Sequence, residues 1–262
     1  MHRLIAFFSL TFAISWACFL ALAVYFPHPA DSPIASQALL LLGTFGPAIA
    51  ALVLLRPKGI LELNWTFSPR WAPFAVLFLA VLKLAVAILA RAVTGSWPRF
   101  GTEGPLVIAA AIVLSTPFQA GEELGWRGFA LPRMAAWLGY GPAALLLGVI
   151  WGVWHLPLFF VRGEYSGQSF PMFAAGTTAL SIAIAFLYVR TGGSILMTML
   201  MHSAVNQTVG IVPDASPEPG PMFTLSATPT FRLSIALLWI CAAYFLVRLK
   251  SVPASAPRKT AA

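Results

Sequence analysis

Long apolar runs, separated by short polar segments, follow one another along this 262-residue chain. An α-helix needs roughly 20 mostly apolar residues to cross the hydrocarbon core of a bilayer. The runs cover about residues 4–26, 34–55, 71–93, 105–123, 141–161, 170–188, 194–212 and 231–249. Only 9% of the residues are charged, whereas a soluble domain carries about 25%. We therefore predict an all-α polytopic membrane protein with about eight transmembrane helices in one bundle.

The whole chain, residues 1–262, is predicted to form a single membrane domain, because the spans and their short loops use up its length. The first run follows a basic start at Arg3 and lacks a clear small-residue cleavage site. We expect it to be a spanning helix, because a signal peptide has a shorter apolar region. Residues 56–70 and 124–140 mix apolar and basic side chains, so we expect both segments at the membrane interface, the second as an interfacial helix.

The basic residues are distributed unevenly between the two sides of the predicted bundle. With the amino terminus inside, the inner side collects eleven of them: Arg3, Arg56, Lys58, Arg70, Arg127, Arg133, Arg190, Arg248, Lys250, Arg258 and Lys259. The outer side has four, Arg91, Arg99, Arg162 and Arg232, together with Asp31, Glu103, Glu164, Asp214 and Glu218. An excess of lysine and arginine marks cytoplasmic loops. The pattern predicts cytoplasmic termini, including the basic tail 250–262, and explains the net charge of +8 without a nucleic-acid partner.

Two adjacent carboxylates, Glu122 and Glu123, end the fourth apolar run of a chain with only eight acidic residues. Burying an ionised carboxylate in hydrocarbon is costly, so intramembrane acids are rare and usually functional. Neighbouring residues on a helix point about 100° apart, and Arg127 lies four residues after Glu123, where it can neutralise that carboxylate. We predict that Glu122 faces a site as the free carboxylate and that Glu123 and Arg127 form a structural pair. The alternative is a plain ion network at a helix end.

Two later runs each carry one histidine, His155 and His202. Pro157 removes a backbone donor just after His155, so we expect the helix to be perturbed there. His202 and Asn206 are spaced i, i+4 and share one helical face, where an imidazole and an amide can converge on one oxygen. Each feature alone has a plainer interpretation: His155 as a packing residue, and His202 with Asn206 as an interhelical hydrogen-bonding pair.

Taken together, these segments are predicted to meet in the membrane and to build one acid/base site. The expected boundaries place Glu122 near the cytoplasmic end of its helix and His202 in mid-span. For the residues to meet, the fourth helix must continue past Glu123, or the fifth must start later than Gly141. Lys83, in the middle of the third run, either pairs with an acid in the bundle or snorkels to the interface.

Other protease chemistries find little support in the chain. It has no His-Glu-x-x-His motif for a zinc protease. Its only aspartates, Asp31 and Asp214, fall in predicted outer loops, which excludes an intramembrane aspartyl dyad. Ser194 lacks the Gly-x-Ser-Gly context of a serine intramembrane protease and is expected to start a helix.

Residues 105–211 resemble the CAAX prenyl endopeptidase and bacteriocin-processing (CPBP, or Abi) family of intramembrane proteases. The Glu-Glu-x-x-x-Arg motif of that family matches Glu122, Glu123 and Arg127. Its Phe-x-x-x-His motif matches Trp151 to His155, with tryptophan in place of phenylalanine, and its His-x-x-x-Asn motif matches His202 to Asn206. The resemblance covers the core of the chain, which we take as the catalytic part.

The resemblance implies an eight-helix bundle with a cavity open to the cytoplasm and to lipid. It also implies that Glu122 activates a water together with His155, and that His202 and Asn206 hold the oxyanion. Glu123, Arg127 and Trp151 would then support the site. No cofactor is expected, because the family resemblance favours a metal-free mechanism. The alternative is zinc held by Glu122, His155 and His202 with an open water position.

We therefore predict a CAAX-type intramembrane endopeptidase, a peptide hydrolase that acts on a membrane-associated or lipid-modified substrate in a bacterial inner membrane. The expected partners are a membrane-anchored peptide or protein substrate and the lipid bilayer; the oligomeric state and cleavage site are not predicted. Two alternatives remain, a non-catalytic scaffold or bacteriocin-immunity protein and a proton-coupled transporter. The chain shows no inverted repeat of the kind that transporters use.

Overall fold

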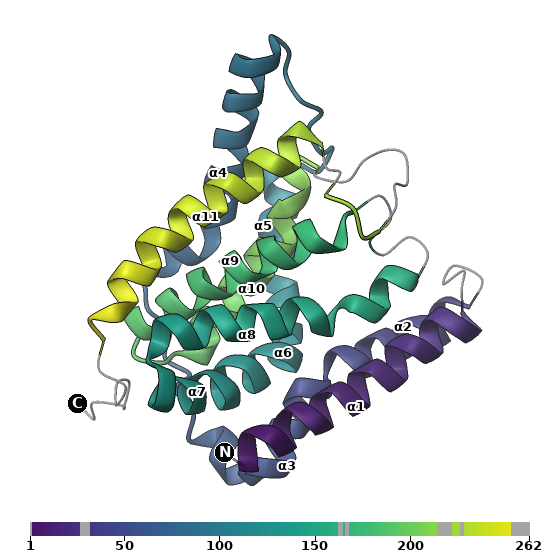
Figure 1. The fold of residues 1–262 in the computed structure, drawn as a ribbon, viewed down its shortest axis with the longest axis vertical. Coiled ribbons are helices and arrows are strands. Elements are labelled where there is room, and N and C mark those ends of the chain that lie inside the picture. Colours follow the sequence, from purple (N-terminus) through teal and green to yellow (C-terminus); the bar gives the residue numbers. More distant parts are fainter. Residues whose placement is uncertain are drawn as a thin grey trace.

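The computed structural model describes residues 2–26, 32–161, 165, 168–213, 222–225 and 228–252, most of which are helical (Figure 1). The α-helices are α1 (His2–Tyr25), α2 (Pro33–Thr44), α3 (Gly46–Leu61), α4 (Ala72–Thr94), α5 (Pro105–Ser115), α6 (Ala120–Gly125), α7 (Leu131–Leu138), α8 (Tyr140–Trp154), α9 (Phe170–Arg190), α10 (Ile195–Thr208) and α11 (Pro229–Lys250). Shorter helical turns join some of them: η2 (Thr116–Gln119), the π-helical η3 (Trp126–Ala130), η4 (Leu156–Phe160) and η5 (Val209–Ile211). The loop charges Asp31, Arg162, Glu164, Asp214, Glu218, Arg258 and Lys259 lie outside the described residues, as does most of the basic tail.

The predicted all-α membrane class is confirmed. Six described helical stretches are long and apolar enough to cross a membrane, and counting the bent pair α2–α3 as one span makes seven. α10 has 14 residues, which is short of the roughly 20 that a full span needs. The predicted number of eight spans is therefore not confirmed.

The second apolar run forms two helices rather than one. α2 and α3 meet at a bend of 44°, where Pro47 cannot donate to the carbonyl of Gly43. Ser15 Oγ of α1 donates to that carbonyl instead, at 2.7 Å. A side chain at Gly46 would collide with Ser15, so glycine lets α1 pack directly against the bend.

The fourth run continues well past its predicted end. Residues 105–138 form one interrupted helical stretch of 34 residues, from α5 through η2, α6 and η3 to α7. The prediction of an interfacial helix over residues 124–140 fails for the first part of that segment, because Trp126, Arg127 and Phe129 are fully buried. Arg127 is therefore an interior residue and not one of the cytoplasmic loop charges. The carboxylate pair lies in the middle of this stretch instead of at its end.

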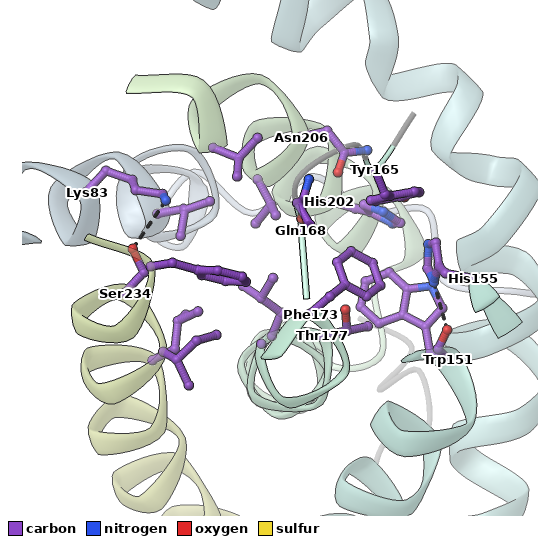
Figure 2. Close-up of a pocket in the computed structure, with 18 of the residues that line it drawn as sticks. Lys83, Trp151, His155, Tyr165, Gln168, Phe173, Thr177, His202, Asn206 and Ser234 are labelled. Atoms are coloured by element: carbon purple, nitrogen blue, oxygen red, sulfur yellow. Dashed lines mark hydrogen bonds between the residues drawn. The ribbon is translucent and has the colours of Figure 1, made fainter. Parts of the chain in front are cut away.

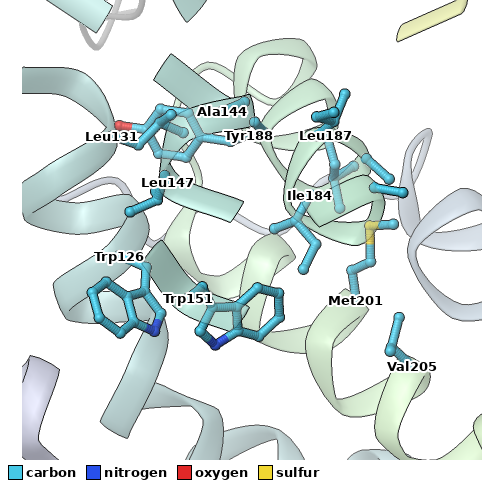
Figure 3. Close-up of a cluster of buried hydrophobic side chains, with 14 of the residues drawn as sticks. Trp126, Leu131, Ala144, Leu147, Trp151, Ile184, Leu187, Tyr188, Met201 and Val205 are labelled. Atoms are coloured by element: carbon cyan, nitrogen blue, oxygen red, sulfur yellow. The ribbon is translucent and has the colours of Figure 1, made fainter. Parts of the chain in front are cut away.

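The core is centred on α9, against which α8, α10 and α11 pack. Every residue from 176 to 188 except Leu180 is buried. α8 approaches α9 closely, since a Cβ atom at Gly148 would lie 2.7 Å from the Cα atom of Thr178. Figure 3 shows part of the resulting cluster, with Leu147, Trp151 and Ile184 among its members.

The two ends of the bundle are formed by different segments of the chain. The terminal end, named for the start of α1 and the end of α11, also holds the segment 62–71 and the turn 191–194. Ile195 N donates to Asn64 O at 2.8 Å, and the Arg190 guanidinium lies 5.2 Å from the centre of the Trp71 ring.

The opposite end, which we call the loop end, holds the segments 95–104, 161–169 and 209–213. Two hydrogen bonds join segments there. Gly101 N donates to Ile211 O at 3.1 Å, and Phe170 N donates to Met222 O at 2.9 Å.

Candidate active site

A cavity of about 400 Å³ opens between α4, α6, α8, α9, α10 and α11. The four predicted catalytic residues all line it: Glu122, His155, His202 and Asn206. Trp151 lines it too, whereas Glu123 and Arg127 do not. Figure 2 shows Trp151 and His155 on one side of this cavity and Lys83 with Ser234 on the other, with Phe173 and Thr177 of α9 between them. The structure thus brings together the four residues predicted to react and one predicted supporting residue, Trp151, whereas the other two, Glu123 and Arg127, lie outside the lining of the cavity.

Glu122 is held by two indole groups. Trp151 Nε1 donates to Glu122 Oε2 at 2.6 Å, and Trp126 Nε1 donates to the same oxygen at 3.3 Å. Glu122 Oε1 has no hydrogen-bond partner among the described residues, and it is not a fully buried atom. One oxygen therefore fixes the carboxylate, and the other is left to face the cavity.

His155 lies where α8 gives way to the 3-10 turn η4, which contains Pro157. The predicted perturbation of the helix at this histidine is therefore confirmed. His155 Nδ1 lies 2.8 Å from the backbone oxygen of Trp151. Because a carbonyl oxygen only accepts, we assign the proton to Nδ1, which leaves a lone pair on Nε2. Aromatic rings surround the imidazole, with the Trp154 centroid at 4.7 Å and the Phe173 centroid at 5.1 Å.

Glu123 forms a buried cluster with Arg127 and His202. Its Oε1 atom lies 2.7 Å from Arg127 Nη1 and 2.8 Å from His202 Nδ1. The three side chains are 0%, 1% and 3% exposed. The Glu123–Arg127 pair occurs as predicted. The bond to His202 was not predicted, because helical spacing shows which residues share a face but not which helix lies opposite.

Asn206 occupies the exposed rim of the cavity. Its Nδ2 atom donates to Gln119 Oε1 at 3.5 Å, and Gln119 lies three residues before Glu122. His202 and Asn206 line the same cavity, in agreement with their predicted shared face. Sequence reasoning missed Gln119, and also Trp126, whose spacing of four residues from Glu122 was the available signal.

Serine hydroxyls set the position of α10 against α5. Ser203 Oγ donates to Ile112 O at 2.7 Å and lies 2.6 Å from Ser115 Oγ. Since Ser203 uses its proton on Ile112, Ser115 must be the donor between the two hydroxyls. Gln207 Nε2 donates to Ser115 Oγ at 3.3 Å. These bonds flank His202 and Asn206 on α10 and fix their depth relative to Glu122.

Lys83 is 1% exposed and reaches the cavity wall. Its Nζ atom donates to Val212 O at 3.1 Å and to Ser234 Oγ at 3.3 Å. The ammonium group therefore points into the bundle, and the prediction that it snorkels to the interface is wrong.

The suggested zinc ligands share the cavity but do not form a compact ligand set. Within the described part of the chain, no three His, Cys, Asp or Glu side chains are grouped as metal ligands would be. Glu122 Oε2 is bound to two indoles, and the Nδ1 atoms of His155 and His202 are bound to Trp151 O and Glu123. The remaining donor atoms are Glu122 Oε1 and the two Nε2 atoms.

Two comparisons with known proteins bear on this site. Residues 102–208 match a family described as type II CAAX prenyl endopeptidase Rce1-like. The chain is also 24% identical over 189 residues to a protein named CAAX prenyl protease 2 from Methanococcus maripaludis, covering 64% of this chain and 70% of that relative. The segment matched to the family contains all seven predicted site residues. Both findings confirm the resemblance that the three motifs indicated.

Proposed function

We propose that this chain is a CAAX-type endopeptidase of the CPBP family of intramembrane proteases, which its similarity to the Rce1-like family and to CAAX prenyl protease 2 supports, and that it hydrolyses its substrate with a water activated by Glu122 and His155. The substrate is a membrane-associated or lipid-modified peptide or protein. We place the enzyme in a bacterial inner membrane with both termini in the cytoplasm. The excess of basic residues at the terminal end supports that orientation.

The observation that carries the mechanism is that two hydrogen-bond acceptor atoms without a partner among the described residues belong to side chains that line the same cavity. Glu122 Oε1 and His155 Nε2 both accept hydrogen bonds, and a water has two protons to donate. A water held by both acceptors turns a lone pair toward a substrate carbonyl. Glu122 then takes its proton as general base and returns it to the leaving amine.

The opposite wall supplies the oxyanion donors. The amide of Asn206 is a donor in its present state, and a donor aimed at a developing oxyanion stabilises the transition state. His202 gives its Nδ1 proton to Glu123, so its Nε2 atom donates only when the ring is an imidazolium. We propose that the buried carboxylate of Glu123 stabilises this cation and that Arg127 holds the carboxylate in place.

We propose that the reaction needs no metal. The support is chemical, because the available acceptors account for water activation and Asn206 with His202 accounts for the oxyanion. If zinc is bound, Glu122 Oε1 and the two Nε2 atoms are the groups that would hold it, and the metal would supply a water of lowered pKa. The two routes differ in their response to a chelator.

The test uses the purified protein in nanodiscs with a quenched peptide library that includes membrane-anchored members. Wild type is compared with Glu122→Gln, His155→Ala and the control Glu103→Gln, which alters an exposed loop glutamate. Cleavage by wild type and control alone, unaffected by a chelator, is the expected result. Loss with the chelator and recovery with zinc would contradict the metal-free mechanism. Undiminished cleavage by Glu122→Gln would contradict the role of Glu122.

A further inference from the structure

We propose that Thr177 of α9 binds the substrate, and that its hydroxyl donates a hydrogen bond to a backbone carbonyl of the peptide segment that lies in the cavity. This inference rests on the proposed protease function and adds a residue that sets the position of the peptide relative to Glu122. Three features of the described residues support it: the missing hydrogen bond of Thr177, its place on the cavity wall, and the apolar surroundings of that wall.

The Thr177 hydroxyl does not bond to its own helix. A threonine inside an α-helix can donate its hydroxyl proton to the backbone carbonyl four residues earlier. The neighbouring Thr178 does so, with Ala174 O at 2.7 Å. Threonines of three other helices behave alike, at 2.6 to 2.8 Å: Thr44, Thr94 and Thr208. Thr177 makes no such bond to Phe173 O, and its hydroxyl has no hydrogen-bond partner among the described residues.

This hydroxyl borders the cavity. Thr177 lines the cavity and is 5% exposed, and its Oγ1 atom is not fully enclosed by neighbouring atoms. Thr11 also lacks a partner, but its Oγ1 atom is fully enclosed, and it belongs to α1, which does not line the cavity. In Figure 2, Thr177 lies on the α9 wall, between the side of the catalytic residues and the side of Lys83. A buried side chain therefore presents an unpaired hydroxyl to the space in which the substrate is proposed to lie.

The wall around Thr177 is apolar. The lining residues of α9 are spaced i, i+3, i+4 and i+7, so they share one helical face: Phe173, Gly176, Thr177 and Leu180. The lining residues of α11 repeat this spacing: Phe231, Ser234, Ile235 and Leu238. On α11 the hydroxyl of Ser234 already accepts a hydrogen bond from Lys83 Nζ at 3.3 Å. Within the described part of these two walls, Thr177 carries the hydroxyl that has no partner.

A peptide that enters such a cavity brings its backbone donors and acceptors with it. A carbonyl left without a hydrogen bond in apolar surroundings is unfavourable. Asn206 and His202 are the proposed donors to the scissile carbonyl, so a neighbouring carbonyl needs another donor. The hydroxyl of Thr177 is a neutral donor whose hydrogen can rotate toward it. A bond there fixes which peptide bond lies beside Glu122, and such positioning lowers the barrier to reaction.

The catalytic water is a less suitable partner for this hydroxyl. Glu122 Oε1 and His155 Nε2 are proposed to accept the two protons of that water. A hydroxyl that donates to the water must therefore use a lone pair of the oxygen that attacks the substrate. That bond would weaken the nucleophile, whereas a bond to the peptide would not. The chemistry therefore favours the substrate as the acceptor.

The first arm of the test measures binding to the Glu122→Gln variant in nanodiscs, so that the probe is not hydrolysed. The probe is a fluorescent, S-prenylated peptide incorporated in the nanodisc. Thr177→Val has the same shape without the hydroxyl and should weaken binding about 10-fold, whereas Thr177→Ser should bind almost as well as Thr177. Thr177→Ala removes the hydroxyl in a second way, and thermal unfolding checks each variant.

The matched control is Thr178→Val, which removes a hydroxyl whose proton is already used on Ala174 O. It should leave binding unchanged. Unchanged binding by Thr177→Val and Thr177→Ala would overturn the inference. Equal weakening by Thr177→Val and Thr177→Ser would also overturn it, because the effect would not depend on the hydroxyl.

The second arm identifies the acceptor on the peptide. One amide of the probe at a time is replaced by an ester, whose carbonyl is a weaker hydrogen-bond acceptor. At one position the ester should weaken binding when Thr177 is present and have no effect on Thr177→Val, since the two changes remove the same bond. Equal sensitivity of both proteins to every ester would overturn the assignment of a peptide carbonyl as the partner.

The third arm measures cleavage with Glu122 restored. Loss of an interaction that is equally strong in the ground state and the transition state raises KM and leaves kcat unchanged. Thr177→Val should therefore raise KM about 10-fold at the same kcat. A lowered kcat at unchanged KM would overturn the inference, because the hydroxyl would then act on the reacting atoms. If Thr177→Val weakens probe binding but wild type cleaves no peptide, the protease proposal fails and the peptide-binding role of Thr177 stands.

Discussion

Replacing Glu123 by glutamine while Arg127 is kept is expected to cost about 3–5 kcal/mol of unfolding free energy. Glu123 Oε1 lies 2.7 Å from Arg127 Nη1, and the two side chains are 0% and 1% exposed. Two unit charges about 4 Å apart interact by about 4 kcal/mol at an effective dielectric constant near 20. Removing one partner of a buried pair costs about 3–5 kcal/mol, because the other charge is left uncompensated. Glutamine keeps the shape of the glutamate side chain and one carbonyl acceptor, so the loss of unfolding free energy measures the effect of removing the negative charge.

A double-mutant cycle isolates the interaction. Glu123→Gln, Arg127→Met and the double variant are unfolded in detergent and compared with Glu62→Gln, an exposed glutamate expected to change stability by less than about 0.5 kcal/mol. The double variant removes both buried charges, so its loss should fall short of the sum of the single losses by about 2 kcal/mol or more. Losses that add within about 0.5 kcal/mol would refute the coupling and, with it, the supporting role of this pair.

Three further outcomes are expected. Asn206→Ala should lower kcat by about 10²–10³-fold through loss of an oxyanion donor and leave thermal unfolding unchanged; a lowered melting temperature with unchanged kcat would contradict this. Gly148→Val should destabilise the protein by about 1–3 kcal/mol, because its Cβ atom would lie 2.7 Å from the Cα atom of Thr178, and equal stability in thermal unfolding would count against the α8–α9 packing. Lys83→Met should lower the free energy of unfolding by about 1–3 kcal/mol in the same assay, because buried acceptors lose a charged donor. The control Lys58→Met, at an exposed position, should leave the free energy of unfolding unchanged. Equal effects of the two substitutions would show that the burial of Lys83 does not matter.

Much of the helical architecture could be predicted from hydropathy, because a bilayer requires apolar segments of a nearly fixed length. The bend between α2 and α3 could not, although Gly46 and Pro47 are visible in the sequence. Their effect depends on α1, whose Ser15 takes over the carbonyl of Gly43. The length of the stretch from α5 to α7 was underestimated because Glu122, Glu123 and Arg127 interrupt its hydropathy. In the structure these charges are compensated inside the bundle, so the helix continues.

The residues of the site could be predicted better than the hydrogen bonds and ion pairs that join them. Intramembrane Glu and His are expensive to bury, so their presence on three predicted segments indicated one cavity, and Glu122, His155 and His202 do line one. The contacts between helices could not be predicted from the sequence in the same way. The hydrogen bond between His202 and Glu123 depends on the depth and rotation of α10. Hydrogen bonds of Ser115 and Ser203 help to set that depth and rotation. Neither serine carries a sequence signal that distinguishes it from ordinary helix polar residues.

The buried charges explain how hydrolysis can proceed in a medium that penalises new charge. In the proposed reaction Glu123 and Arg127 compensate each other, and the negative charge of Glu122 is balanced when His202 is an imidazolium. As Glu122 takes the proton of the attacking water, its charge disappears and a negative charge forms on the substrate oxygen facing His202 and Asn206. The net charge of the cavity stays the same, and the negative charge moves from one wall to the other. Because a low dielectric makes an uncompensated charge costly and a paired one strong, this arrangement favours the transition state without requiring water to surround it.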